Sequence, residues 1–183
     1  MTEMKNVTNI ESLSYEKLVE LLTHEDKWLR VDAVIELEGR GERRAVAPLL
    51  ELLAREDKLT QPRIIEALGN LKGKEAVEPL LKLLAQEQQG EILLEIPLAL
   101  AKIGDQRAIE PLKLCLASPL PQLAAEAIKA LFFLRAKGLG PQLQAMLEPL
   151  EAEHEAQGEQ MDAGRNSLRL VIQRALPQFT KLG

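Results

Sequence analysis

The chain of 183 residues carries a formal net charge of −5, and 46% of its residues are apolar although only 3% are aromatic. A chain of this length can bury a substantial core. Because aromatic residues are few, Leu, Ala, Ile and Val must fill that core, and this choice of side chains favours packed helices over sheets. The single cysteine, Cys115, excludes an internal disulfide, and the N-terminal residues show neither the apolar core of a signal peptide nor a membrane-spanning run. We therefore expect a cytoplasmic protein.

In chain order, residues 1–14 form an N-terminal lead and residues 15–25 a half repeat, after which one pattern recurs four times. The copies occupy about residues 26–56, 57–87, 88–118 and 119–149. The similarity is clearest between ALGNLKGKEAVEPLLKLL (67–84) and ALAKIGDQRAIEPLKLCL (99–116). A recurring period of this length is the signature of a stacked repeat protein.

Each copy predicts two helices joined by a short turn. The first helix has apolar residues at helical spacing, and it stops near a glycine that can adopt the left-handed conformation; these glycines are Gly41, Gly73, Gly104 and Gly138. The second helix has a wide apolar stripe, as in VEPLLKLL (77–84). A stripe of this width needs cover from neighbouring pairs, so the copies must stack.

The composition changes after the fourth copy. Residues 148–162 contain six carboxylates and no Lys or Arg, so we predict an acidic tether over residues 150–166. The stretch SLRLVIQRAL (167–176) again shows apolar residues at helical spacing and predicts a capping helix that ends before Pro177, followed by a tail to residue 183. The tether can approach the basic turns described below or meet a basic partner.

The form ALxxIGDxRAIEPL at residues 99–112 resembles HEAT repeats, and in particular the short HEAT-like repeats named after phycobilisome lyases. The resemblance covers about residues 15–147. It implies an all-α, right-handed α-solenoid of stacked antiparallel helix pairs, closed by the C-terminal capping helix. The fourth copy departs from the pattern, because Phe132 replaces the small Gly69 and Ala101 of the other copies.

The sequence presents no set of residues that predicts catalysis, so we expect no enzyme activity, no cofactor and no metal. HEAT-like deoxyhypusine hydroxylases hold iron with several His-Glu pairs, whereas this chain has only His24 and His154. Cys115 falls at a packing position of its repeat. The resemblance leaves a bilin lyase, or a phycobilisome assembly or degradation factor, as the alternative.

Two surfaces are candidates for binding. In HEAT proteins the second helices form the concave face, and the resemblance therefore implies a partner-binding ladder there, which we call the second-helix ladder. Its residues are Glu16, Lys17, Glu20, Ala47, Glu51, Arg55, Glu78, Lys82, Glu110 and Leu114. Glu51 with Arg55, and Glu78 with Lys82, are spaced for ion pairs within one helix.

The second surface is the basic turn edge, formed by cations in the turns between paired helices: Arg40, Arg43, Arg44, Lys72, Lys74, Lys102, Arg107, Arg135 and Lys137. Either surface can instead be solvated. Because the sequence pI is about 5.3 and the ladder is acidic, we expect no duplex nucleic acid on the concave face. We predict a monomeric, non-catalytic scaffold or adaptor that binds a protein partner of unknown identity through its concave face.

Overall fold

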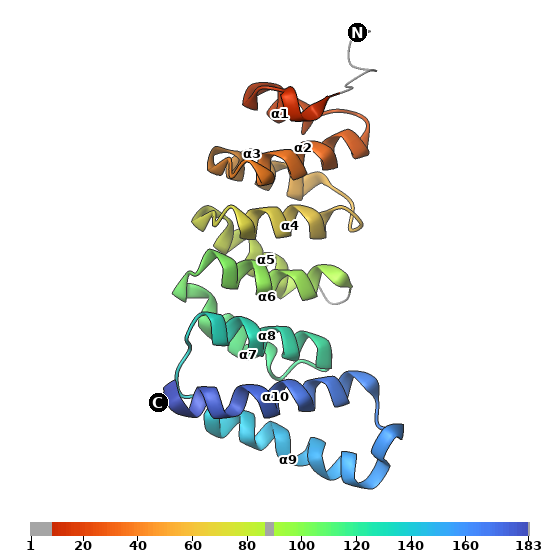
Figure 1. The fold of residues 1–183 in the computed structure, drawn as a ribbon, viewed down its shortest axis with the longest axis vertical. Coiled ribbons are helices and arrows are strands. Elements are labelled where there is room, and N and C mark those ends of the chain that lie inside the picture. Colours follow the sequence, from red (N-terminus) through yellow and green to blue (C-terminus); the bar gives the residue numbers. More distant parts are fainter. Residues whose placement is uncertain (1–8, 87–89, 183) are drawn as a thin grey trace.

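A computed structural model describes residues 9–86 and 90–182, and this part of the chain contains ten α-helices and no strand. The helices are α1 (Tyr15–Leu21), α2 (Lys27–Gly39), α3 (Val46–Arg55), α4 (Gln61–Asn70), α5 (Val77–Gln86), α6 (Glu91–Ile103), α7 (Ile109–Cys115), α8 (Pro121–Phe133), α9 (Gly140–Gln157) and α10 (Ala163–Leu182). Each predicted copy contains one helix pair, and the pairs follow one another along a single stack (Figure 1). The prediction of an all-α solenoid is confirmed.

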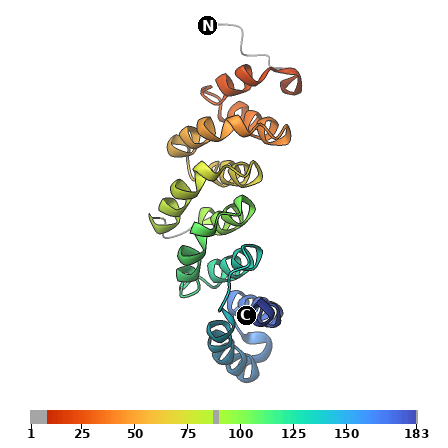
Figure 2. The same ribbon diagram turned by 90° about the vertical axis from the view of Figure 1, so that its left-hand side faces the viewer.

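The stack has two layers, which we call inner and outer. The inner layer consists of α2, α4, α6, α8 and α10, whose neighbours pack directly on one another. The outer layer consists of α3, α5, α7 and α9; α3, α5 and α7 pack more closely against the inner helix that follows each of them than against one another. Figure 2 shows the result as a shallow arc, with the inner layer on its hollow side.

One apolar core runs the length of the stack, from Leu18 in α1 to Phe179 in α10. Both helices of every pair contribute to it. Within the outer helix α5, for example, Leu80 is fully buried while Leu81 and Leu84 lie at the margin of the core. Thr60 is the one buried polar residue among those that the structure describes.

The inner helices of the four copies end in the same way. The residue that follows each helix and takes a left-handed conformation is Gly41 (φ 67°), Lys72 (φ 54°), Gly104 (φ 78°) or Arg135 (φ 55°). The sequence-based choice of Gly73 was wrong, because its φ is −73°. Gly73 is constrained instead by space, since a Cβ there would lie 2.5 Å from Val46 Cγ2.

The left-handed conformation of Lys72, rather than of Gly73, can be tested by substitution. Lys72→Gly is expected to raise the free energy of unfolding by up to about 1 kcal/mol, because a left-handed L-residue costs about 1–2 kcal/mol and the greater unfolded-state entropy of Gly offsets about 0.4–1 kcal/mol of that. The matched control is Lys74→Gly in the same turn, outside the left-handed region, which is expected to destabilise the protein. Thermal unfolding followed by circular dichroism measures both; equal destabilisation would contradict the argument.

The inner layer is closely packed where α4 meets α6. A Cβ built on Gly69 of α4 would lie 2.7 Å from Ala99 Cα of α6, and this contact is with backbone that cannot rotate away. Gly69→Ala is therefore expected to cost about 1–3 kcal/mol, as overpacking usually does. Chemical denaturation measures the loss. Gly39→Ala at the end of α2, where a Cβ meets nothing within 4 Å, is the control and should not destabilise.

Two predictions for the C-terminal region were wrong. The acidic tether is absent, because α9 continues through Pro149 to Gln157, and the capping helix does not end before Pro177 but spans Ala163–Leu182. Proline removes one helical hydrogen bond at a cost of about 3 kcal/mol. Here apolar burial on both sides outweighs that cost, through Leu147 and Leu150 in α9 and Ile172 and Phe179 in α10.

The capping role itself is confirmed. Helix α10 packs against α8 and α9 and takes the place of the inner helix of a further repeat (Figure 1). The acidic residues of α9 contribute to this contact: Arg165 lies 2.6 Å from Glu153, and Gln173 donates to Glu151 at 2.9 Å. These carboxylates therefore contact α10, and not the basic turn edge.

Candidate interaction surfaces

The described residues contain no group of three or more His, Cys, Asp or Glu side chains that could hold a metal ion. His24 lies in the α1–α2 turn, where its Nδ1 accepts a hydrogen bond from the Asp26 N–H at 3.0 Å. His154 lies in α9, at the other end of the stack (Figure 1). Cys115 is buried, which confirms its packing position, and burial raises the pKa of its thiol.

Every residue of the second-helix ladder is exposed, but the structure corrects its place in the fold. The ladder belongs to α1, α3, α5 and α7, and the helices α3, α5 and α7 lie on the bulging side of the arc (Figure 2). The residues Glu16, Lys17, Glu20, Ala47, Glu51, Arg55, Glu78, Lys82, Glu110 and Leu114 therefore do not form the concave face. The reason is the tighter packing of the inner helices, which bends the stack toward them. Whether the ladder binds a partner stays a prediction.

Two ladder residues bind the neighbouring repeat. Glu78 pairs with Arg107 of the next copy at 3.0 Å, and Arg55 donates to the Leu22 carbonyl oxygen of the preceding half repeat at 2.6 Å. Between α3 and α5 the outer layer has a mainly apolar hollow of about 420 Å³ whose lining includes Leu50 and Leu83. Some ladder residues therefore hold neighbouring repeats together, whereas Lys82 lines the hollow between α3 and α5.

The turns of the basic turn edge lie along one side of the stack, the left-hand side in Figure 1. Several of their cations hold repeats together. Arg40 pairs with Glu36 at 2.6 Å and donates to the Leu13 carbonyl oxygen at 2.7 Å, and the Arg44 guanidinium lies 3.7 Å from the centre of the Tyr15 ring.

One further pair in these turns involves Arg107 and Asp105. The pKa of Asp105 is lowered to about 2, because the Arg107 side chain and backbone N–H both donate to its carboxylate. The same guanidinium also reaches Glu78. At neutral pH, part of the positive charge of this edge is therefore compensated within the chain.

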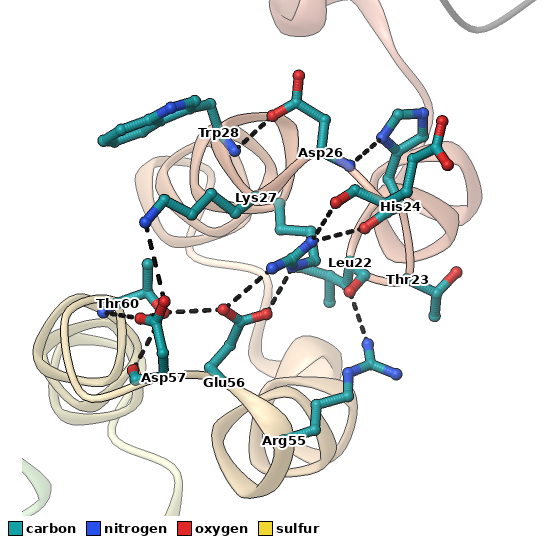
Figure 3. A network of polar contacts seen from close by, with 12 residues as sticks. Leu22, Thr23, His24, Asp26, Lys27, Trp28, Arg55, Glu56, Asp57 and Thr60 are labelled. Atoms are coloured by element: carbon teal, nitrogen blue, oxygen red, sulfur yellow. Dashed lines mark hydrogen bonds and ion pairs between the residues drawn. The ribbon is translucent and has the colours of Figure 1, made fainter.

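The opposite edge, between consecutive copies, holds a polar network (Figure 3). Arg30 of α2 forms two hydrogen bonds with Glu56, at 2.5 and 3.1 Å, and also donates to the carbonyl oxygens of His24 and Glu25. The Thr60 hydroxyl donates to Glu56 at 2.8 Å. Hydrogen bonding from Arg30 lowers the pKa of Glu56. This network ties the α1–α2 turn to the α3–α4 turn.

The concave surface of the arc is the exposed side of the inner layer, and it was not predicted from the sequence. It carries a polar cluster in which Arg63 of α4 pairs with Glu38 of α2 and with Glu66, and Asn70 donates to Glu38. It also exposes five large apolar side chains, of which Trp28 and Ile35 are two turns apart on α2: Trp28, Ile35, Phe132, Phe133 and Leu170. The sequence shows that Ile35, Phe132 and Phe133 are apolar. It does not show which layer of helices lies on the concave side of the arc.

The inner face has a hollow of about 210 Å³ between α8 and α10. Its lining from α8 is Ile128, Lys129, Phe132 and Phe133, and its lining from α10 is Val171, Arg174, Ala175 and Gln178. Apolar atoms make up most of the lining, and the two cations belong to it. A concave apolar site with a few polar groups is the general form of a recognition site.

Comparison with known proteins supports the architecture. A family model described as HEAT repeats matches residues 15–96 and again residues 63–132. The chain is similar in fold to the crystal structure of an engineered protein from the Northeast Structural Genomics Consortium, with a TM-score of 0.54 and 24% identity, over 92% of this chain and 80% of that one. No curated protein matches at a significant level.

Among the described residues, no helix has both the length and the apolar character needed to cross a bilayer.

The HEAT model covers residues 15–132, well over half of the sequence, and its matched range begins at α1 and ends within α8. The chain belongs to the HEAT repeat family.

Proposed function

We propose that this protein is a non-catalytic scaffold or adaptor in the cytoplasm that binds a protein partner on the inner face of its arc. HEAT solenoids commonly act as protein-interaction scaffolds, and stacked repeats provide the extended concave surface that such binding uses. The observation that carries the proposal is the exposure of large apolar side chains on this face. Ile35 and Phe133 are 46% and 67% exposed in a chain whose other large apolar residues are mostly buried.

The two kinds of residue on the inner face have different roles in this proposal. Apolar and aromatic side chains that become desolvated supply most of the binding energy in protein interfaces, so Ile35 and Phe133 are the expected anchors. In the polar cluster, Arg63 is already paired with both Glu38 and Glu66. The cluster contributes chiefly to orientation and to selection between partners.

The phycobilisome-lyase alternative receives less support. Transfer of a bilin needs an accessible nucleophile or a convergent acid/base pair, and Cys115 is buried with a raised thiol pKa. A direct test is to mix the purified protein with a bilin and a bilin-free acceptor subunit and to follow the visible absorbance. Transfer to the acceptor would replace the scaffold proposal with the lyase one.

Site-specific photo-cross-linking tests the proposal itself. A photoreactive amino acid is placed at Ile35 or Phe133 on the inner face, or at Glu51 or Leu114 on the second-helix ladder, and the full chain is irradiated in its native cells. We expect the same partner to be captured from both inner positions and not from the ladder. Capture from the ladder alone would move the binding surface to the outer layer, and capture from neither surface would contradict a scaffold function.

A further inference from the structure

We propose that the hollow between α8 and α10 recognises an acidic segment of the partner, which inserts one bulky apolar side chain between Phe133 and α10. This inference rests on the scaffold function proposed above and adds the chemistry of the bound segment. Three observations support it: the size of the hollow, the fixed position of its aromatic wall, and the charge of its rim.

The hollow suits a single side chain. Its volume of about 210 Å³ is below the roughly 300–1,000 Å³ of a typical small-molecule site. Ile128 is buried at its base, and Val171 and Ala175 are half-buried beside it. Insertion of an aromatic or leucine side chain would bury these apolar atoms and cover Phe133, which is the most exposed aromatic ring of the inner face.

The aromatic wall is already in place without a ligand. Phe132 contacts the buried Phe179 of the capping helix edge-on, with the ring centroids 5.9 Å apart, and it contacts Phe133 in the same manner at 6.3 Å. The core therefore fixes Phe132, and Phe132 supports Phe133. A site whose residues are held before binding loses less conformational entropy when the partner arrives.

The charge of the rim favours carboxylates. Helix α10 contains four cations, Arg165, Arg169, Arg174 and Lys181, and no acidic residue. Arg165 pairs with Glu153 on the α9 side, whereas Arg174 is exposed at the hollow, and no described carboxylate pairs with it.

The second cation of the rim, Lys129, belongs to α8. It pairs with Glu126 at 2.6 Å, but this lysine is half exposed. Exposed pairs of this kind contribute little, so a carboxylate of the partner can replace Glu126. An acidic segment is thus complementary to this rim, and a basic segment is repelled by it.

A selection from a random peptide library displayed on phage tests the inference, with the full chain as the immobilised target. We expect the enriched peptides to carry net negative charge around a Trp, Phe or Leu. Synthetic copies of these peptides should bind at least about tenfold more weakly to the Phe133→Ser and Arg174→Glu variants, because a central aromatic anchor and a complementary charge are lost. The matched controls, Leu59→Ser and Lys58→Glu, alter an exposed Leu and an exposed cation in the α3–α4 turn, outside every candidate surface, and should bind normally.

Each other outcome has a defined meaning. Enrichment of basic peptides, binding that Phe133→Ser and Arg174→Glu leave unchanged, or no enrichment would overturn the acidic-segment inference. A fall in sedimentation mass on Phe133→Ser would also overturn it, because the hollow would then be occupied by a second copy of the chain. The scaffold proposal is judged separately by the cross-link from Ile35, which lies away from the hollow, so failure of one leaves the other testable.

Discussion

Replacing Phe179 by alanine is expected to lower the free energy of unfolding by about 3–5 kcal/mol, the usual range for a buried Phe. The Phe179 side chain is 2% exposed and is the largest of the fully buried side chains. It lies in α10, where the ring contacts Phe132 of α8 edge-on. Its removal leaves a cavity beneath the capping helix and takes away the support of the aromatic wall.

The loss should be local as well as large. Each element of a repeat stack contacts only its neighbours, so α9 and α10 should lose protection from hydrogen exchange while α2 and α4 keep theirs. Hydrogen exchange read by mass spectrometry resolves this distribution. Phe133→Ala is the control, since it removes an equal ring that is mostly exposed and should change stability by about 0.5 kcal/mol or less. Equal effects of the two substitutions would mean that α10 does not cap the core.

Replacing Arg30 by methionine is expected to cost about 3–5 kcal/mol at neutral pH, because it leaves the Glu56 charge buried without its partner. The two side chains are only 17% and 6% exposed. The substitution also leaves the carbonyl oxygens of His24 and Glu25 without the donor that satisfies them (Figure 3). Arg107→Met is the control, since Arg107 is 52% exposed and the pairs of such a residue contribute about 1 kcal/mol or less.

The pH dependence of this loss has a defined sign. Hydrogen bonding from Arg30 lowers the folded-state pKa of Glu56 below its usual value of 4.5. The stabilisation is therefore fully present above pH 4.5 and is lost as the pH falls through the folded-state pKa. In Arg30→Met, protonation of Glu56 relieves the unpaired charge, so the difference between the two proteins should shrink in acid. Urea denaturation over a range of pH measures it; a constant difference would show that Glu56 is not its source.

The arrangement of the helices could be predicted from the sequence because its signals are local and repeated. Apolar spacing and the turn residues of each copy placed the helix pairs, and the stack followed from the width of the apolar stripes. The same spacing did not distinguish the deepest positions. Leu80 and Leu81 belong to one stripe, yet only Leu80 is fully buried, because burial depends on the neighbouring helix as well as on the face.

The direction of the bend could not be predicted, because it depends on contacts between copies. Gly69 lets α4 approach the backbone of α6 at Ala99, and this approach draws the inner helices together. The approach depends on Gly69 and Ala99 facing each other across two helices, and the apolar spacing within one helix does not indicate that pairing. The proposed binding surface was missed for the same reason: the second-helix ladder was assigned to the concave side by resemblance, whereas Ile35 and Phe133 belong to α2 and α8 of the layer that is actually concave.

The prolines near the end of the chain led to wrong predictions of helix ends. Pro149 and Pro177 indicated breaks, but both lie inside helices, as Pro97 does in α6. Local propensity is a weak signal where a long apolar face is buried on either side of the proline. Six carboxylates in residues 148–162 also indicated a solvated tether. Sequence composition could not show that Glu151 and Glu153 meet Gln173 and Arg165 of the following helix.

The unequal packing of the two layers determines how the solenoid responds to force. The inner helices are already in contact, so sharper bending compresses packed side chains that resist it. Straightening brings the outer helices together, and the hollow of about 420 Å³ between α3 and α5 provides room for that movement. The stack is therefore an elastic element with one-sided compliance: its ends separate more easily than they approach. A partner that forces the two ends apart would lengthen the arc, whereas one that pulls the two ends together would meet a stiff inner layer.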